Sequence, residues 1–399
     1  MNSKLSKLLS DSGLTLISSL LATGVQQLII YPQLSSLMSA SSYGNFLAVM
    51  GIVNIIASSF GSELCNTILV VSGGRQARAI SRTIFCLTMT FPLVSVIGAV
   101  VAILIFDISI EMTLLSGVLI FLECLRWFLV VVFRIHLRFD RYLFAGIWYV
   151  TGMCIGFVIS LETKIWLMSF LVGDICMIAY TLLRSEGYFR LSSFRISEVF
   201  RSGDTKTYAT MVLSSLVGNL NTYIDRVLLA PILGSTAVSI YYVASWFGKS
   251  LSIVASPVRT VMLSHLSHSS GGISRSQYVK VSLCMIGLCV IVIIVSILVS
   301  PIVTSFFYPT LIGDARPYLI LGNTASIVSI FNLINMTLLL RMAPIRWQLL
   351  LSSARVFLYV AACTLGAFCF GVLGFIVALL AVNVAIFIVL FFIGYKYAR

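Results

Sequence analysis

Apolar stretches long enough to cross a lipid bilayer recur along the whole chain. A helix needs roughly 20 mostly apolar residues to span the hydrocarbon core. Twelve runs meet this requirement: 12–31, 44–66, 83–106, 112–133, 142–160, 165–183, 208–233, 239–262, 281–304, 318–340, 349–369 and 373–394. The pattern predicts an all-α polytopic membrane protein with about 12 transmembrane helices.

The scarcity of charge excludes several classes of protein. Hydrophobic residues make up 59% of the 399 positions and charged residues 10%, and the mean hydropathy is +1.07. A soluble domain has about a quarter charged residues, which cover its surface. A water-soluble enzyme, a disordered chain and a secreted disulfide scaffold are therefore excluded.

Two boundaries between runs depend on local turn signals. No charge separates the first two runs, and Tyr31-Pro32-Gln33, followed by several serines, is expected to form the turn between them. The last two runs are separated only by Gly371 and Gly374. Eleven spans are the alternative if these glycines do not form a turn.

The positive charges are distributed unequally between the loops. Of the 26 Lys and Arg residues, nineteen fall on one side of the predicted membrane and only Lys164 and Arg316 on the other. Because Lys and Arg in short loops stay in the cytoplasm, both termini are expected there. The net charge of +13 then requires no nucleic-acid partner. Five cations remain within the runs: Arg126, Arg226, Lys249, Arg259 and Arg355.

The two halves of the chain repeat each other at an offset of 199 residues, close to half its length. Gln26 to Pro32 aligns with Asp225 to Pro231, and after one gap the segment from Tyr43 aligns with that from Tyr241. Halves of six spans share one topology, which places their symmetry axis along the membrane normal with a cleft between them. Two bundles shaped only by packing are the alternative. The predicted N-terminal lobe, cytoplasmic linker and C-terminal lobe are 1–183, 184–206 and 207–399.

Polar residues within the runs are the candidates for a substrate-binding and translocation cavity. A charge inside the bilayer is costly and normally turns toward protein or water. The broad polar face of run 208–233 includes Asn219, Thr222, Asp225 and Arg226. Lys249 lies too deep in its run to reach the interface, whereas Arg355 is near enough to an end for snorkelling to be the alternative.

Four carboxylates within or at the ends of runs are candidates for coupling to an ion gradient: Asp225, Glu63, Glu123 and Asp174. Glu123 lies three residues before Arg126, a further cavity candidate, so a neutralising pair that locks this helix is the alternative. For Glu63 and Asp174 the alternative is a bond to a neighbouring helix.

No motif of an enzyme, a cofactor site or a metal site is present in the sequence. The three histidines are not arranged as in a metalloprotease, and no nucleophile elbow, P-loop or Asp-rich cluster occurs. The chain is therefore predicted not to be an enzyme and to need no cofactor. Isolated cations in apolar surroundings instead suit an anionic substrate.

Two segments carry a resemblance to a known family. The sequence from Asp225 to Gly234, continuing through Ala237-Val238 and Tyr241, resembles polysaccharide-unit flippases. Tyr43-Gly44-Asn45-Phe46 is similar to the Tyr-Gly-x-Phe signature of the same proteins. They are the O-antigen (Wzx-type) members of the multidrug/oligosaccharidyl-lipid/polysaccharide exporter superfamily. Only the motif positions Tyr43, Gly44, Asp225 and Arg226 are carried over from the family.

The resemblance implies a fold, a substrate and a location. It implies two six-helix lobes that form a V around a cationic central cavity in the bacterial inner membrane. The implied substrate is an undecaprenyl-pyrophosphate-linked oligosaccharide, moved from the cytoplasmic to the periplasmic leaflet for lipopolysaccharide biosynthesis. The implied partners are the lipid bilayer, a polysaccharide polymerase and a chain-length regulator.

Three alternatives for the function remain, of which the first is also a transporter and the other two belong to other classes of protein. A drug exporter of the same superfamily would favour an acidic, aromatic cavity. A membrane polysaccharide polymerase would need a larger outer loop than this chain has. A scaffold subunit of an assembly complex would show no transport.

Overall fold

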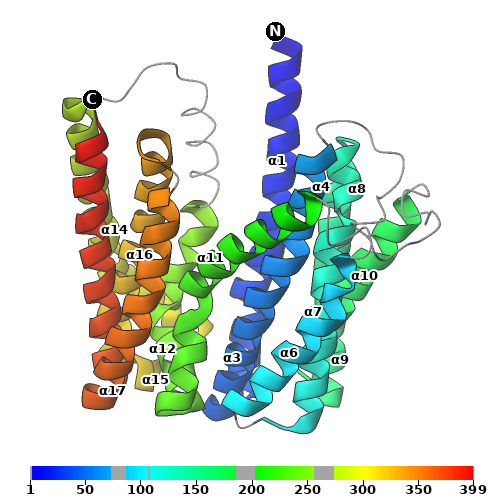
Figure 1. The fold of residues 1–399 in the computed structure, drawn as a ribbon. Helices are drawn as coiled ribbons and strands as arrows, with labels where there is room; N and C mark the ends of the chain where they lie inside the picture. Colours follow the sequence, from blue (N-terminus) through cyan, green and yellow to red (C-terminus); the bar gives the residue numbers. More distant parts are fainter. Residues whose placement is uncertain are drawn as a thin grey trace. The chain divides into compact units, whose positions relative to one another are not determined.

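The computed structural model describes residues 2–72, 87–106, 108–185, 203–255, 274–344 and 346–398. These residues are helical almost throughout and include no strand (Figure 1). Each of the twelve predicted apolar runs contains helix in its described part. The prediction of an all-α polytopic membrane fold is confirmed.

The helices follow the apolar runs in order. In the first part of the chain they are α1 (Asn2–Val25), the π-helix η1 (Gln26–Ile30), α2 (Tyr31–Leu37), α3 (Ala40–Ala57), the π-helix η2 (Ser58–Ser62), α4 (Glu63–Ser72), α6 (Thr90–Ile105), α7 (Ile110–Leu129), α8 (Val131–Ile135), α9 (Phe139–Thr163) and α10 (Met168–Arg184). The later helices are α11 (Gly203–Leu233), α12 (Ser235–Ser250), α14 (Arg275–Phe307), α15 (Ile312–Ala315), the 3₁₀-helix η4 (Arg316–Tyr318), α16 (Leu319–Met342) and α17 (Arg346–Tyr397).

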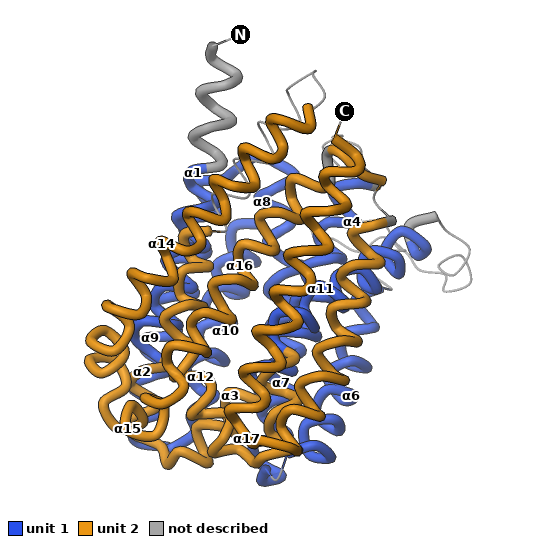
Figure 2. The backbone as a smooth tube through the Cα atoms, turned by 90° about the vertical axis from the view of Figure 1, so that its left-hand side faces the viewer, with its two compact units in different colours: residues 1–30, 49–223 blue, residues 31–48, 224–399 orange. Residues whose placement is uncertain are grey.

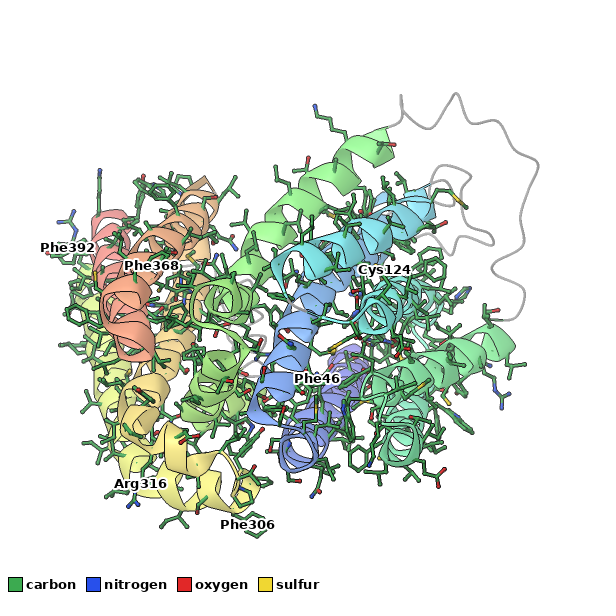
Figure 3. All side chains as sticks on the ribbon, turned by 90° about the horizontal axis from the view of Figure 1, so that it is seen from below. Phe46, Cys124, Phe306, Arg316, Phe368 and Phe392 are labelled. Carbon is green, nitrogen blue, oxygen red and sulfur yellow. The ribbon has the colours of Figure 1, made fainter. Side chains whose placement is uncertain are left out.

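Large apolar side chains cover the outside of the helices, as a bilayer requires. Among the described residues, six helical segments are long and apolar enough to cross a membrane: Gly13–Leu37, Ala40–Val70, Phe139–Thr163, Arg275–Phe307, Ile312–Leu339 and Trp347–Tyr397. Figure 3 shows Phe306 and Phe392 at the edge. The exposed fractions of Phe306, Phe368 and Phe392 are 80%, 73% and 63%. Lipid tails would cover such side chains at no cost in solvation.

The chain divides into two compact units that each include segments from both halves of the sequence (Figure 2). Unit 1 comprises Met1–Ile30 and Val49–Tyr223, and unit 2 comprises Tyr31–Ala48 and Ile224–Arg399. The long helix α11 therefore belongs to unit 1 up to Tyr223 and to unit 2 from Ile224 on. The two compact units are defined by which residues pack together, whereas the predicted lobes are defined by the sequence repeat. The lobe boundaries therefore stay a prediction.

The first expected turn is displaced from its predicted position. Tyr31-Pro32-Gln33 is helical, and the chain breaks instead at Met38 and Ser39. Proline lacks the N–H that would bond to the carbonyl four residues earlier. The wider π-helix η1 ends at Ile30, directly before α2, and so accommodates Pro32 within a continuous helix. The serines supply the turn, because the Ser39 hydroxyl accepts a hydrogen bond from the Ser42 N–H and caps α3.

The turn predicted between the last two runs is confirmed. Within α17, Phe370 and Gly371 have non-helical backbone angles, and Gly371 has φ +60°, a value that favours glycine. A Cβ atom on Gly366 would lie 2.4 Å from the Gly374 carbonyl oxygen. Small residues on both sides of the turn thus let the two halves of α17 approach closely.

Candidate functional site

A buried ion pair joins α11 and α12 in unit 2. The Lys249 Nζ lies 2.5 Å from Asp225 Oδ2, and the Tyr241 hydroxyl donates to the same oxygen at 2.8 Å. The Arg226 backbone N–H donates to the other oxygen, Asp225 Oδ1, at 2.9 Å. The Lys249 side chain is 20% exposed and that of Asp225 9%. Lys249, which the sequence placed far from either expected interface, thus has a carboxylate partner inside the protein.

Aromatic rings surround the two cations of this cluster. The Arg226 guanidinium lies 4.7 Å from the centre of the Tyr242 ring, and Lys249 Nζ lies 4.5 Å from that of Tyr241. Tyr43 and Tyr308 pack edge-on against Tyr242, with ring centres 6.2 and 6.3 Å away. Such rings attract a cation with their electron-rich faces while keeping water away. Asp225, Lys249 and Arg226 with these tyrosines are hereafter the 225–249 cluster.

The Tyr43-Gly44-Asn45-Phe46 motif contacts the start of α12 within unit 2. The Ser235 hydroxyl donates to Asn45 Oδ1, and the Ser239 hydroxyl donates to the Ala40 carbonyl. A Cβ atom on Gly44 would lie 1.7 Å from the Ser235 carbonyl oxygen, so only glycine permits this approach. The motif therefore holds α3 against α12 beside the 225–249 cluster.

Arg355 occupies a second site in unit 2, between α16 and the two halves of α17. Its Nη2 donates to Ser329 Oγ, Asn383 Oδ1 and Tyr359 Oη at 2.6–2.7 Å, and its Nε also donates to Tyr359. The residue is 6% exposed. The alternative that it snorkels to the interface is wrong, because three neutral oxygens hold the guanidinium inside.

The third charged site is in unit 1, where one arginine lies between two carboxylates. Arg126 Nε on α7 pairs with Asp174 Oδ1 on α10, and Arg126 Nη2 lies 3.4 Å from Glu123 Oε1. Asp174 is fully buried. The expected pair between Glu123 and Arg126 is present, and Asp174 bonds to the neighbouring helix. These three residues are hereafter the 123–174 cluster.

The remaining predicted residues lie apart from these clusters. Asn219 donates to Ser59 Oγ at 2.9 Å in unit 1, and the exposed Thr222 donates to the Gly218 carbonyl of its own helix. Glu63 accepts a hydrogen bond from Asn66 at 3.1 Å. Arg259 lies outside the described residues. The candidates thus form separate groups, since α11 passes from one unit to the other.

Several partners of the buried cations were not predicted from the sequence. Tyr359 and Asn383 hold Arg355, and Tyr242 covers Arg226. The spacing of Arg355 and Tyr359, four residues apart on one helix, was a signal that could have been used. No comparable signal marked Asn383, which is distant in sequence. Among the described residues, no group of three or more His, Cys, Asp or Glu side chains could hold a metal ion.

Solved structures with the same helix arrangement are transporters. An inward-facing multidrug resistance MATE family transporter of the MOP superfamily is 13% identical, with a TM-score of 0.66 over 96% of this chain and 94% of that one. The lipid II flippase MurJ in an inward closed conformation is 14% identical, with a TM-score of 0.69 over 98% and 87%. The Vibrio cholerae MATE transporter VcmN in the bent form is 13% identical, with a TM-score of 0.56 over 99% and 97%.

The chain has the fold of these MOP-superfamily transporters. No family model and no curated protein matches its sequence. At such identities the likeness concerns the fold, and the substrate has to be inferred from the residues of this chain. The resemblance to the superfamily is thus confirmed for the fold, whereas the Wzx-type assignment stays a prediction.

Proposed function

We propose that this protein flips an undecaprenyl-pyrophosphate-linked oligosaccharide, such as an O-antigen unit, from the cytoplasmic to the periplasmic leaflet of the bacterial inner membrane. The lobes would alternate between access to either side. The 225–249 cluster would bind the pyrophosphate, and the lipid tail would remain in the bilayer. A polysaccharide polymerase and a chain-length regulator are the proposed partners, and no chemical step is assigned to the chain.

The surplus of positive charge inside unit 2 carries this proposal. Among the described residues of unit 2, Arg226 and Lys249 lie inside the protein beside the carboxylate of Asp225, and Arg355 is buried at the second site. The 225–249 cluster thus has a formal charge of +1, and Arg355 adds one further positive charge to the interior of unit 2. A diphosphate carries the opposite charge, and arginine and lysine are its usual protein partners.

Alanine substitution of the cluster tests the proposal. Lys249→Ala and Arg226→Ala should abolish surface polysaccharide in a strain that lacks its flippase, because each removes a cation that would hold the headgroup. Lys249→Arg keeps the charge and should retain activity. Lys280→Ala, an exposed lysine on α14, is the matched control and should have no effect. Immunoblots of the membrane fraction check that every variant accumulates.

The outcome that contradicts the proposal is full restoration of surface polysaccharide by both alanine variants. A multidrug exporter of the same fold is the alternative, because transporters of that type share the architecture. It predicts that the unmodified protein raises resistance to cationic drugs and leaves surface polysaccharide unrestored. The two assays together separate these functions.

A further inference from the structure

The 123–174 cluster carries unbalanced charge in the interior of unit 1. Glu123 is 4% exposed, Arg126 9% and Asp174 0%. One guanidinium neutralises one carboxylate, so the three ionised groups together leave a formal charge of −1. An uncompensated charge in surroundings without water is costly, and two carboxylates that share a site do not both ionise freely. One bound proton would make the cluster neutral.

The atoms of Asp174 indicate where this proton can reside. Asp174 Oδ1 is engaged by Arg126 Nε, whereas Asp174 Oδ2 is buried and has no hydrogen-bond partner among the described residues. An ionised carboxylate normally attracts donors to both oxygens. When one oxygen is buried without a partner, the neutral carboxylic acid is less costly than the ionised carboxylate, so these surroundings favour a bound proton.

The other titratable groups around the cluster supply no compensating charge. Tyr149 on α9 presents its ring face to Arg126, with 4.4 Å from the guanidinium carbon to the ring centre, and Cys124 on α7 is also buried beside the carboxylates. Phenols and thiols are neutral when protonated. Glu63 on α4 bonds to Asn66, and Arg134 on α8 donates to that same residue at 3.2 Å. Helix α6 and the π-helix η2, which also pack on α7, contain no charged residue.

Tight helix packing connects the cluster to the neighbouring helices. A Cβ atom on Gly152 would lie 2.7 Å from the Val172 carbonyl oxygen, and one on Gly156 would lie 2.4 Å from that of Met168. α9 and α10 are therefore in close backbone contact just before Asp174 on α10 and just after Tyr149 on α9. Because α9 and α10 pack so closely, we expect them to move together. A change in the ion pair between Arg126 and Asp174 would then alter how this helix pair packs on α7.

We propose that the Glu123–Arg126–Asp174 cluster binds one exchangeable proton, shared between its two carboxylates, and that transport uses its uptake and release. Protonation converts a carboxylate to a carboxylic acid and leaves Arg126 paired with the other one. Loss of the proton restores the second negative charge and strengthens the attraction of α10 for Arg126. Only the role in transport rests on the proposed function; the binding of the proton does not.

Infrared difference spectroscopy of the purified protein in lipid vesicles tests the proton site without any substrate. A C=O stretching band of a buried carboxylic acid is expected on titration from alkaline to acidic pH, with the shift in deuterated water that identifies such a group. Asp174→Asn and Glu123→Gln should each remove or displace the band. Glu63→Gln, which changes a carboxylate outside the cluster, should leave it unchanged. Labelling aspartate or glutamate with ¹³C in the unmodified protein assigns the band even if a variant does not fold.

The absence of such a band at every pH, or its persistence in both cluster variants, would overturn the proton site. For the role in transport, Asp174→Asn mimics a permanently protonated side chain and should abolish surface polysaccharide at normal protein levels. Full activity of that variant would overturn the role. If Lys249→Ala and Arg226→Ala stay active while the band behaves as expected, the proposed function fails and the proton site stands.

Discussion

Asp225 has two structural roles in the 225–249 cluster. It neutralises part of the charge of Lys249 and Arg226, and it accepts hydrogen bonds from Tyr241 and from the Arg226 backbone. A diphosphate that binds Lys249 would compete with this carboxylate for the ammonium group. Asp225 is thus best understood as an internal counter-ion that keeps the cations inside the protein in the absence of substrate.

Removing this counter-ion should destabilise unit 2. Asp225→Ala leaves Lys249 without its partner, and breaking a buried pair in this way costs about 3–5 kcal/mol. Asp225→Ala combined with Lys249→Met should be less destabilised, because the orphaned charge is also removed. Thermal unfolding in detergent measures both variants. Equal stability of Asp225→Ala and the parent protein would show that water already solvates Lys249.

At the scale of elements, the close contact of α3 with α12 explains why glycine occupies position 44. The contact places the carbonyl of Ser235 where a side chain at position 44 would be. It also brings together two segments that the repeat aligns, since Tyr43 corresponds to Tyr241 and packs against Tyr242. A glycine in a helix normally weakens it by about 1 kcal/mol relative to alanine, and here the packing offsets that loss.

A larger residue at position 44 should separate the two helices. We expect Gly44→Val to prevent the disulfide that cysteines introduced at Asn45 and Ser235 would otherwise form, because those residues are in hydrogen-bond contact. Gly24→Val on α1, where a Cβ atom would meet nothing within 4 Å, is the control. Gel shifts under oxidising conditions in a background without native cysteines report the cross-link. Unchanged cross-linking in Gly44→Val would contradict the prediction.

For the whole molecule, the distribution of Lys and Arg predicts how the helices are oriented in the membrane. Nineteen of the 26 cations belong to one set of loops. The turn at Gly371 separates the last two runs and supports an even number of predicted crossings, for which both termini are expected on the same side of the membrane. We expect these charges to set the orientation because the transfer of Lys and Arg across the bilayer is unfavourable.

Reporter fusions test this orientation. Alkaline phosphatase fused after Arg316 should be active, because that loop is expected in the periplasm, whereas a fusion after Arg141 or Tyr397 should be inactive. Green fluorescent protein fused at the same positions should give the opposite pattern. Phosphatase activity at the C-terminus would mean an odd number of crossings and would overturn the predicted topology.

The sequence alone determined that this is an all-α membrane protein, the order of its apolar helices and the turn at Gly371. These features depend on the length of each apolar run and on the backbone freedom of glycine, which are local properties of the chain. The sequence also singled out Lys249, since a charge so far from an interface requires a partner. The break at Met38 escaped prediction, because the π-helix before Pro32 lets the helix continue. Only the tertiary structure decided that Asp225 pairs with Lys249, that Asn383 holds Arg355 and that Asp174 shares Arg126 with Glu123. Pairing between buried charges depends on which helices pack together, and that is settled by contacts between residues far apart in the chain.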